Sequence, residues 1–252
     1  MKALLYISFL GTDYCGYQIQ PNGVTVQQKL NEAAKALFGY DCDIVGCSRT
    51  DSGVHANCFC ATVSKKGSDE LITTIPVEKI PFAIANYLPD DISVFDAKAV
   101  DGSFHPRYDV KYKEYVYRIL NRPQRDPFEY GRTWHYPKEI TPDELEKMRK
   151  AASAFVGTYD FSSYMSADTK VRDTVRTVYK ADVTKNGNII EFRVSANGFL
   201  YNMVRIFTGT LIAVAEGKIS PDDIEAITLS RDRRRAGITA PAEGLYLNKV
   251  IY

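Results

Sequence analysis

The amino-acid sequence predicts an α+β fold in which two halves are each built on a mainly antiparallel sheet. Runs of strand-like residues follow one another with helices interspersed, which differs from the strict strand–helix alternation of a parallel fold. Asn186 and Gly187 join two apolar runs, and this dipeptide is a strong hairpin signal. The chain has 252 residues, of which 45% are apolar, enough to bury a sizeable core.

In the first half, residues 2–10 alternate like a strand. Thr25 and Gln28 have the spacing of a capping box ahead of an apolar stripe, which predicts a helix that ends at Gly39. Apolar and β-branched patterns then predict strands at 43–47 and 58–64, a helix at 77–88 and a strand at 92–95.

In the second half, residues 115–119 are typical of a strand, and Thr141 followed by Pro142 predicts the start of a helix that closes at Gly157. The hairpin strands are expected at about 174–184 and 188–196, a helix at about 200–216, and a short helix from Ser220. The boundary between the halves is expected near 102–107, which gives domains 1–104 and 105–252.

The net charge is only +1, which is low for a nucleic-acid-binding protein. The charge is unevenly distributed, because residues 1–100 carry −3 and residues 101–252 carry +4. Basic residues gather in the second half at Arg172, Arg176, Arg231, Arg233, Arg234 and Arg235. Charge alone therefore leaves an RNA partner open, since such runs are usually solvated surface.

Several classes of protein lose support from missing patterns. The sequence has no Walker A loop, no dinucleotide-binding G-x-G-x-x-G after a strand, no H-E-x-x-H and no G-x-S-x-G. The five cysteines lack the paired spacing of a zinc site, so no metal is expected. No apolar run is long enough to cross a membrane and the start lacks a cleavage signal, which predicts a cytoplasmic protein.

The densest polar group of residues lies at 48–55, Ser-Arg-Thr-Asp-Ser-Gly-Val-His. Arg49 stands two residues before Asp51, so on an extended segment its guanidinium can keep that carboxylate ionised. Gly53 allows a tight backbone there. By spacing alone, a turn stabilised by Asp and Ser side chains explains the same residues.

The segment 46–56, GCSRTDSGVHA, resembles the active-site motif GRTD(A/S)GVH of the TruA family of tRNA pseudouridine synthases. Four further blocks resemble that family in the same order: GTDYCGYQ at 11–18 with TVQ at 25–27, FHPRY at 104–108 with YVY at 115–117, FLYNMVR at 199–205, and AGITAPAEGLYL at 236–247. Together they cover nearly the whole chain. Two positions depart from the family pattern, Ser48 in place of Gly and Val116 in place of Arg.

The resemblance implies a pseudouridine synthase fold, with RRM- or ferredoxin-like halves around a central cleft. It implies isomerisation of uridine to pseudouridine at positions 38, 39 and 40 of the tRNA anticodon stem-loop, by a homodimer that needs no cofactor. The family's nucleophile corresponds to Asp51, on the N-terminal domain. Its carboxylate can attack the ribose C1′ or the base C6, or remove a ribose proton on a glycal route, and the sequence does not choose among these.

The resemblance also implies substrate-binding residues. Arg49 pairs with Asp51 or holds a phosphate, Tyr115 stacks on the extruded uracil, Arg205 is a second partner for Asp51, and Leu245 is an apolar wall. Without the family, Tyr115 would be a half-buried strand tyrosine, Arg205 a solvated helix arginine and Leu245 a core residue.

Three alternatives are weighed against this interpretation. A non-catalytic RNA-binding module would keep the fold without turnover, and the presence of Arg49, Asp51, Tyr115 and Arg205 argues against it. A glycosidase needs two carboxylates at a defined separation, whereas only Asp51 has an identifiable setting here. A pseudouridine synthase acting on another RNA is compatible with every motif above.

Overall fold

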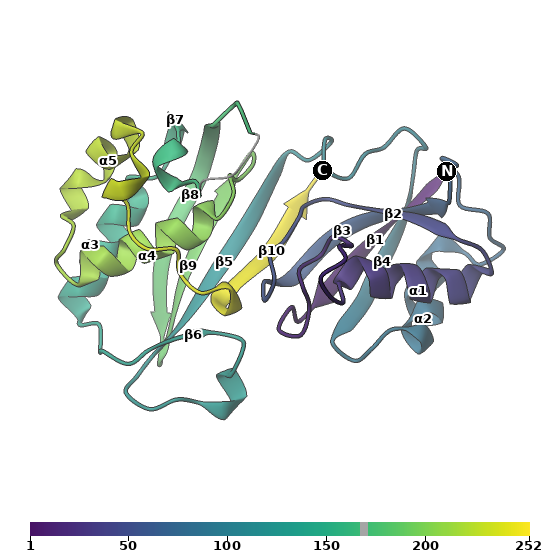
Figure 1. Cartoon of the computed structure of the whole chain (residues 1–252), viewed down its shortest axis with the longest axis horizontal. Coiled ribbons are helices and arrows are strands. Elements are labelled where there is room, and N and C mark those ends of the chain that lie inside the picture. Colours follow the sequence, from purple (N-terminus) through teal and green to yellow (C-terminus); the bar gives the residue numbers. More distant parts are fainter. Residues whose placement is uncertain (167–170) are drawn as a thin grey trace. The chain divides into compact units, whose positions relative to one another are not determined.

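The computed structural model describes residues 1–166 and 171–252. These residues form two compact units, one made of Met1–Lys111 with Tyr246–Tyr252 and the other of Tyr112–Leu245. Each unit combines helices with a sheet whose strand pairs are mainly antiparallel, so the predicted α+β class is confirmed (Figure 1). In the described part of the chain, no helix is long and apolar enough to cross a membrane.

The first unit has the strand and helix order of a ferredoxin-like half, β-α-β-β-α-β. Its strand β1 pairs antiparallel with β3 on one side and with β4 on the other, β2 pairs antiparallel with β3, and β10 pairs parallel with β3 through Tyr246 and Leu247. The elements are β1 (Lys2–Phe9), α1 (Val26–Phe38), β2 (Cys42–Gly46), β3 (His55–Lys65), α2 (Ile80–Ile84), β4 (Ile92–Val100) and β10 (Leu245–Ile251).

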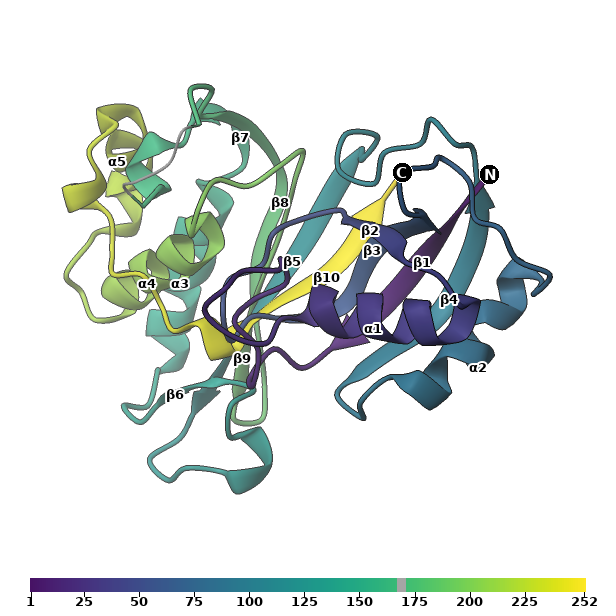
Figure 2. The same cartoon turned by 45° about the vertical axis from the view of Figure 1, so that its right-hand side comes forward.

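Helix α1 forms where its sequence predicts it. The Thr25 hydroxyl accepts a hydrogen bond from the backbone N–H of Gln28 at 3.3 Å. The Gln28 side chain instead donates to Glu32, so only half of the predicted capping box is present. Figure 2 shows α1 and α2 on one side of the sheet of this unit, and α1 buries one stripe there, made of Val26, Leu30, Ala33 and Ala34. The predicted 77–88 helix is the short α2 between two 3₁₀ turns, Val77–Lys79 and Ala85–Tyr87.

The second unit carries its strands in the order β5-β9-β8-β7, all antiparallel, with β6 parallel to β5. Helices α3 and α4 contact each other, and α3 also contacts β8. The elements are β5 (Tyr112–Asn121), β6 (Trp134–Tyr136), α3 (Pro142–Ser153), β7 (Gly157–Asp160), β8 (Val175–Asn186), β9 (Ile189–Ala196), α4 (Met203–Ala215) and α5 (Ile224–Ser230). Short 3₁₀ turns lie at Pro127–Glu129, Ser162–Tyr164, Pro221–Asp223, Arg233–Arg235 and Ala242–Gly244.

Two predicted helix ends in this unit differ from the structure. Helix α3 has a complete capping box at Thr141 and Glu144 but ends at Ser153, because the next three N–H groups bond to carbonyls three residues back; Gly157 begins β7 instead. Helix α4 begins at Met203 rather than near 200, since Asn202 at its N-cap adopts a left-handed conformation with φ 61°.

The boundary between the units also differs from the expected division at 104/105. Residues 105–111 belong to the first unit, where the Tyr252 hydroxyl donates to the Pro106 carbonyl and the Lys111 N–H donates to the Ile251 carbonyl, both at 2.8 Å. The last seven residues, Tyr246–Tyr252, return to that unit. No local pattern shows this return, because the pairing of β10 with β3 joins residues far apart in sequence.

Candidate active site

Asp51 lies on the loop between β2 and β3 and is half-buried. The loop turns tightly, because the Val54 N–H donates to the Asp51 carbonyl at 3.1 Å and Gly53 has φ 78°. Its backbone is also bonded to a second loop: the Tyr17 N–H donates to the Thr50 carbonyl at 3.1 Å. The residues on both sides of Asp51 are therefore held by main-chain groups.

The second loop, residues 11–17, fits closely against the Asp51 loop. The Ser52 hydroxyl donates to the Tyr14 carbonyl at 3.0 Å, and the Tyr14 hydroxyl donates to Asp91 at 2.6 Å. Gly16 has φ 80°, and a Cβ atom there would lie 2.6 Å from the Thr50 carbonyl oxygen. A side chain at position 16 would push the Asp51 loop away, so the close contact requires glycine.

His55 is buried and follows the loop as the first residue of β3. Its Nδ1 accepts a hydrogen bond from the Gly11 N–H at 2.9 Å, and its ring lies 4.6 Å from the Tyr246 ring centroid. His55 thus contacts both the loop at residues 11–17 and strand β10. These contacts stabilise the position of the Asp51 loop within this unit.

Arg49 is exposed on the same loop. Within residues 1–166 and 171–252, its guanidinium makes no hydrogen bond or ion pair. Of the two roles suggested for Arg49, the ion pair with Asp51 is therefore not formed. An exposed guanidinium on this loop suits the other role, a contact with an RNA phosphate, since it is permanently charged and presents several donors.

Tyr115 and Leu245 are both buried in the second unit, each 7% exposed. The Tyr115 ring, on β5, stands edge-to-face against Phe199 with centroids 5.0 Å apart. Tyr117, two residues further on the same face, donates from its hydroxyl to the Pro241 carbonyl at 2.6 Å. Leu245 begins β10, directly after the turn Ala242–Gly244.

Arg205 lies in the first turn of α4, and two hydrogen bonds orient its guanidinium. Its Nε donates to the Ala240 carbonyl at 2.7 Å, and its Nη1 donates to the Asn202 side chain at 2.8 Å. The Ala240 N–H returns a hydrogen bond to the Arg205 carbonyl at 3.1 Å. Tyr201 lies before the helix begins.

The second unit thus brings two of the predicted residues, Arg205 and Leu245, to one segment of chain, while Tyr115 packs against Phe199. Residues 240–245 accept hydrogen bonds from Arg205 and from Tyr117, which neighbours Tyr115 on β5, and they end at Leu245. Asp51 and Arg49 share one loop of the first unit. Asn202 and Ala240 were missed from the sequence, because no local pattern marks a residue whose role is to orient an arginine 3 or 35 residues away.

Of the two departures from the family pattern, Val116 has a clear setting. The residue is only 3% exposed and lies opposite Arg193 of β9. Arg193 itself forms ion pairs with Glu114 and Glu191, at 3.1 and 3.3 Å. A guanidinium therefore lies beside position 116 on the neighbouring strand, but two carboxylates compensate its charge.

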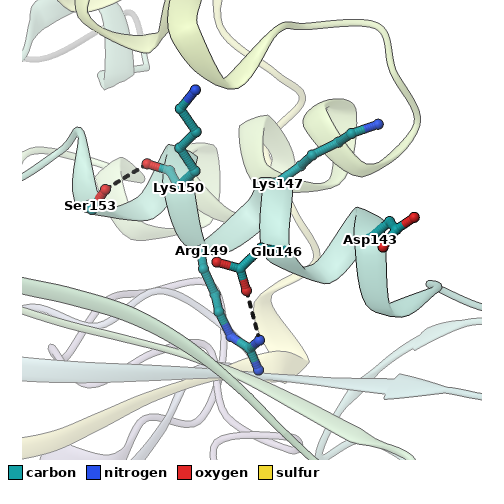
Figure 3. A pocket seen from close by; sticks show the side chains of 6 residues that line it. All are labelled: Asp143, Glu146, Lys147, Arg149, Lys150 and Ser153. Carbon is teal, nitrogen blue, oxygen red and sulfur yellow. Dashed lines mark hydrogen bonds and ion pairs between the residues drawn. The ribbon is translucent and has the colours of Figure 1, made fainter.

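A separate pocket opens on the surface of α3, lined by Asp143, Glu146, Lys147, Arg149, Lys150 and Ser153 (Figure 3). Its charges are partly compensated: Arg149 pairs with Glu146 at 3.1 Å, and Lys150 pairs with Asp222 at 2.6 Å. None of the predicted site residues lines this pocket. It therefore carries no catalytic assignment.

A family model described as tRNA pseudouridine synthase matches residues 5–109 and 151–252. The tRNA pseudouridine synthase A of Thermoanaerobacter sp. (strain X514) is 46% identical over 253 residues, covering 100% of this chain and 99% of that protein. The enzyme of the same name from Clostridium acetobutylicum is 41% identical over 248 residues, covering 98% of each chain. A solved structure, "Crystal Structure of a Cbf5-Nop10-Gar1 Complex", matches with a TM-score of 0.37 and 12% identity over 97% of this chain and 48% of that one, a likeness too weak to support a shared fold.

Proposed function

Because the chain belongs to the TruA family of tRNA pseudouridine synthases, which isomerise uridine in tRNA, we propose a specific site and nucleophile for it. It acts at positions 38, 39 and 40 of the anticodon stem-loop, with Asp51 as the nucleophile. It does so in the cytoplasm as a homodimer, without a metal or an organic cofactor. The single observation that carries the Asp51 assignment is the motif GCSRTDSGVHA on a loop that holds this carboxylate half-buried.

The reaction needs no redox partner. The N1–C1′ bond of uridine breaks and a C5–C1′ bond forms, while the hydrogen on C5 is lost to solvent and N1 gains a proton. Asp51 attacks C1′ or C6, or removes a ribose proton, and each route needs a carboxylate that is ionised and precisely placed. The hydrogen bonds around Thr50, Ser52 and Val54 hold the loop that carries this carboxylate, which supports the assignment.

Four further residues complete the proposed site. Tyr115 stacks on the uracil that has been turned out of the RNA, an interaction worth about 1–3 kcal/mol per base. Leu245 forms an apolar wall for the same base. Arg205 acts as a second partner for the Asp51 carboxylate, and its hydrogen bonds to Ala240 and Asn202 hold the guanidinium ready for that role. Arg49 contacts a phosphate.

The test is release of tritium from [5-³H]uridine-labelled tRNA transcripts, because forming the C5–C1′ bond expels that hydrogen. Transcripts with a single uridine at position 38, 39 or 40 should release tritium with the wild-type protein and not with Asp51→Ala. The control variant is Asp69→Asn, which removes a carboxylate that is 80% exposed in the same unit. EDTA should leave the rate unchanged.

Each contrary result points to a different alternative. Tight tRNA binding without any release would favour a non-catalytic RNA-binding module. Release from uridines outside positions 38–40, or from another RNA alone, would overturn the proposed substrate. A monomer in sedimentation at assay concentration would remove the homodimer from the proposal.

A further inference from the structure

The arginine run near the C-terminus is largely engaged within the chain. Arg231 forms an ion pair with Asp160 at 3.1 Å, and Arg234 forms one with Asp232 at 2.8 Å. Arg233 differs from both, because its side chain is partly buried and its partners are neutral. Burial lowers the pKa of its guanidinium. Among the described residues no carboxylate pairs with this guanidinium, so neutral groups alone offset its desolvation cost, which indicates a specific structural task.

The task is visible in its hydrogen bonds. Nη1 of Arg233 donates to the Gly237 carbonyl at 2.8 Å, and Nη2 donates to the Thr239 hydroxyl at 3.3 Å. Both acceptors lie on the segment between α5 and β10, which is yellow in Figure 1. The planar guanidinium spans the turn that this segment makes and fixes two of its positions at once.

The same segment is pressed against α4. The Gly237 N–H donates to the Thr210 hydroxyl at 2.9 Å. A Cβ atom at Gly209 would lie 1.9 Å from the Ile238 carbonyl oxygen, so the backbones touch directly at this point. One helical turn earlier, Ala240 exchanges two hydrogen bonds with Arg205, at 2.7 and 3.1 Å.

We propose that Arg233 is a positioning residue for uridine isomerisation, which holds the 236–240 segment so that the Ala240 carbonyl orients the Arg205 guanidinium. The inference rests on the role proposed above for Arg205. Without the guanidinium of Arg233, the Gly237 carbonyl and the Thr239 hydroxyl lose their donor. The Ala240 carbonyl then shifts relative to α4, and Arg205 loses its anchor. Arg233 itself does not touch the substrate.

The test compares single-turnover rates and tRNA dissociation constants of Arg233→Ala, Arg233→Lys and Arg234→Ala. Loss of the anchor should slow turnover by about 10- to 100-fold in Arg233→Ala, the range expected for small misplacements of a catalytic group. The dissociation constant should stay within about two-fold, because no phosphate contact is lost. Arg233→Lys should be as slow as Arg233→Ala, since an ammonium group lacks the fork. Arg234→Ala should match the wild type, because that side chain is 90% exposed and, in the part of the chain that the structure describes, its hydrogen bonds go to Asp232 alone.

A double-mutant cycle separates positioning from a general loss of stability. On an Arg205→Ala background, adding Arg233→Ala should slow turnover no further, because the anchored group is already absent. Should Arg233→Ala fail to fold, Thr239→Val and Thr239→Ser replace it, with slower turnover expected in the valine variant alone.

Three results would overturn the proposal. Rescue of turnover by Arg233→Lys, with weaker tRNA binding in Arg233→Ala, would make the residue a phosphate contact. Equal slowing by Arg233→Ala with and without Arg205 would make it merely structural. A wild-type rate in Arg205→Ala would show that Arg205 has no role in turnover, so Arg233 would have nothing to position. If tritium release in that variant still depended on Asp51, the proposed function would be unaffected.

Discussion

The loop that carries Asp51 and the helix start that carries Arg205 differ in how far apart their residues lie in the sequence. Asp51 lies within one contiguous motif, and its loop is held by hydrogen bonds within that motif and to the loop at residues 11–17. Arg205 is oriented by Asn202, which lies three residues before it, and by a carbonyl 35 residues further along the chain. The motif residues of the first site are contiguous, whereas the residues that orient Arg205 come from separate segments. The contiguous site at Asp51 can be recognised from the sequence alone. The assembled site at Arg205 cannot, because the orientation of its guanidinium depends on the contacts that hold residues 236–240 against α4.

The largest effect is expected at the contiguous site. Asp51→Asn removes the charge and keeps the shape, so turnover should fall by more than about 10³-fold, as when an essential nucleophile is lost. Binding of tRNA should remain close to the wild-type value. Single-turnover tritium release with a filter-binding assay measures both, and residual turnover within about ten-fold of wild type would contradict the nucleophile assignment.

In the second unit, substitutions of Tyr115 test whether its ring or its hydroxyl is needed for turnover. Tyr115→Ala should lose about 1–3 kcal/mol of stacking, which corresponds to roughly 5- to 150-fold in kcat/KM. Tyr115→Phe should keep most activity, because its ring is preserved against Phe199. Equal loss in the two variants would point to the hydroxyl instead.

The main-chain attachment of the Asp51 loop can be tested with a glycine pair. Gly16 and Gly39 have nearly the same φ, 80° and 78°, but only at Gly16 would a Cβ meet another residue within 4 Å. Gly39→Ala should cost about 1–2 kcal/mol for the left-handed conformation alone. Gly16→Ala should cost more and should also slow turnover, as measured by thermal unfolding and by tritium release. Unchanged turnover in a folded Gly16→Ala would show that this contact does not position Asp51.

The smallest effect is expected when one side-chain hydrogen bond of the same loop is removed. Ser52→Ala deletes the bond to the Tyr14 carbonyl and should cost about 0.5–1.5 kcal/mol, with a small loss of turnover. Thr141→Ala, which deletes the N-cap of α3, should cost about 1 kcal/mol with no loss of turnover. Equal activity of the two variants would mean that Ser52 contributes to stability only.

The sequence-based expectations succeeded where the physical cause is local. The start of α1 at Thr25, the start of α3 at Thr141 and the hairpin at Asn186 and Gly187 were all predicted, because each depends on residues within a few positions of one another. Where the end of a helix or the formation of a short strand depends on contacts with distant residues, the predictions were less accurate. Helix α3 stops four residues before Gly157, and β6 and β7 were not predicted from their short runs.

By itself, the sequence determined the α+β class, the family and the motif that carries Asp51, since all three are written in contiguous residues or in local periodicity. Only the tertiary structure decided that Arg49 makes no ion pair with Asp51, that the Ala240 carbonyl orients Arg205, and that Tyr246–Tyr252 belong to the first unit. These features arise from hydrogen bonds and strand pairs between residues far apart in the chain. Such contacts leave no local pattern, because each partner taken alone is an ordinary arginine, alanine or strand residue.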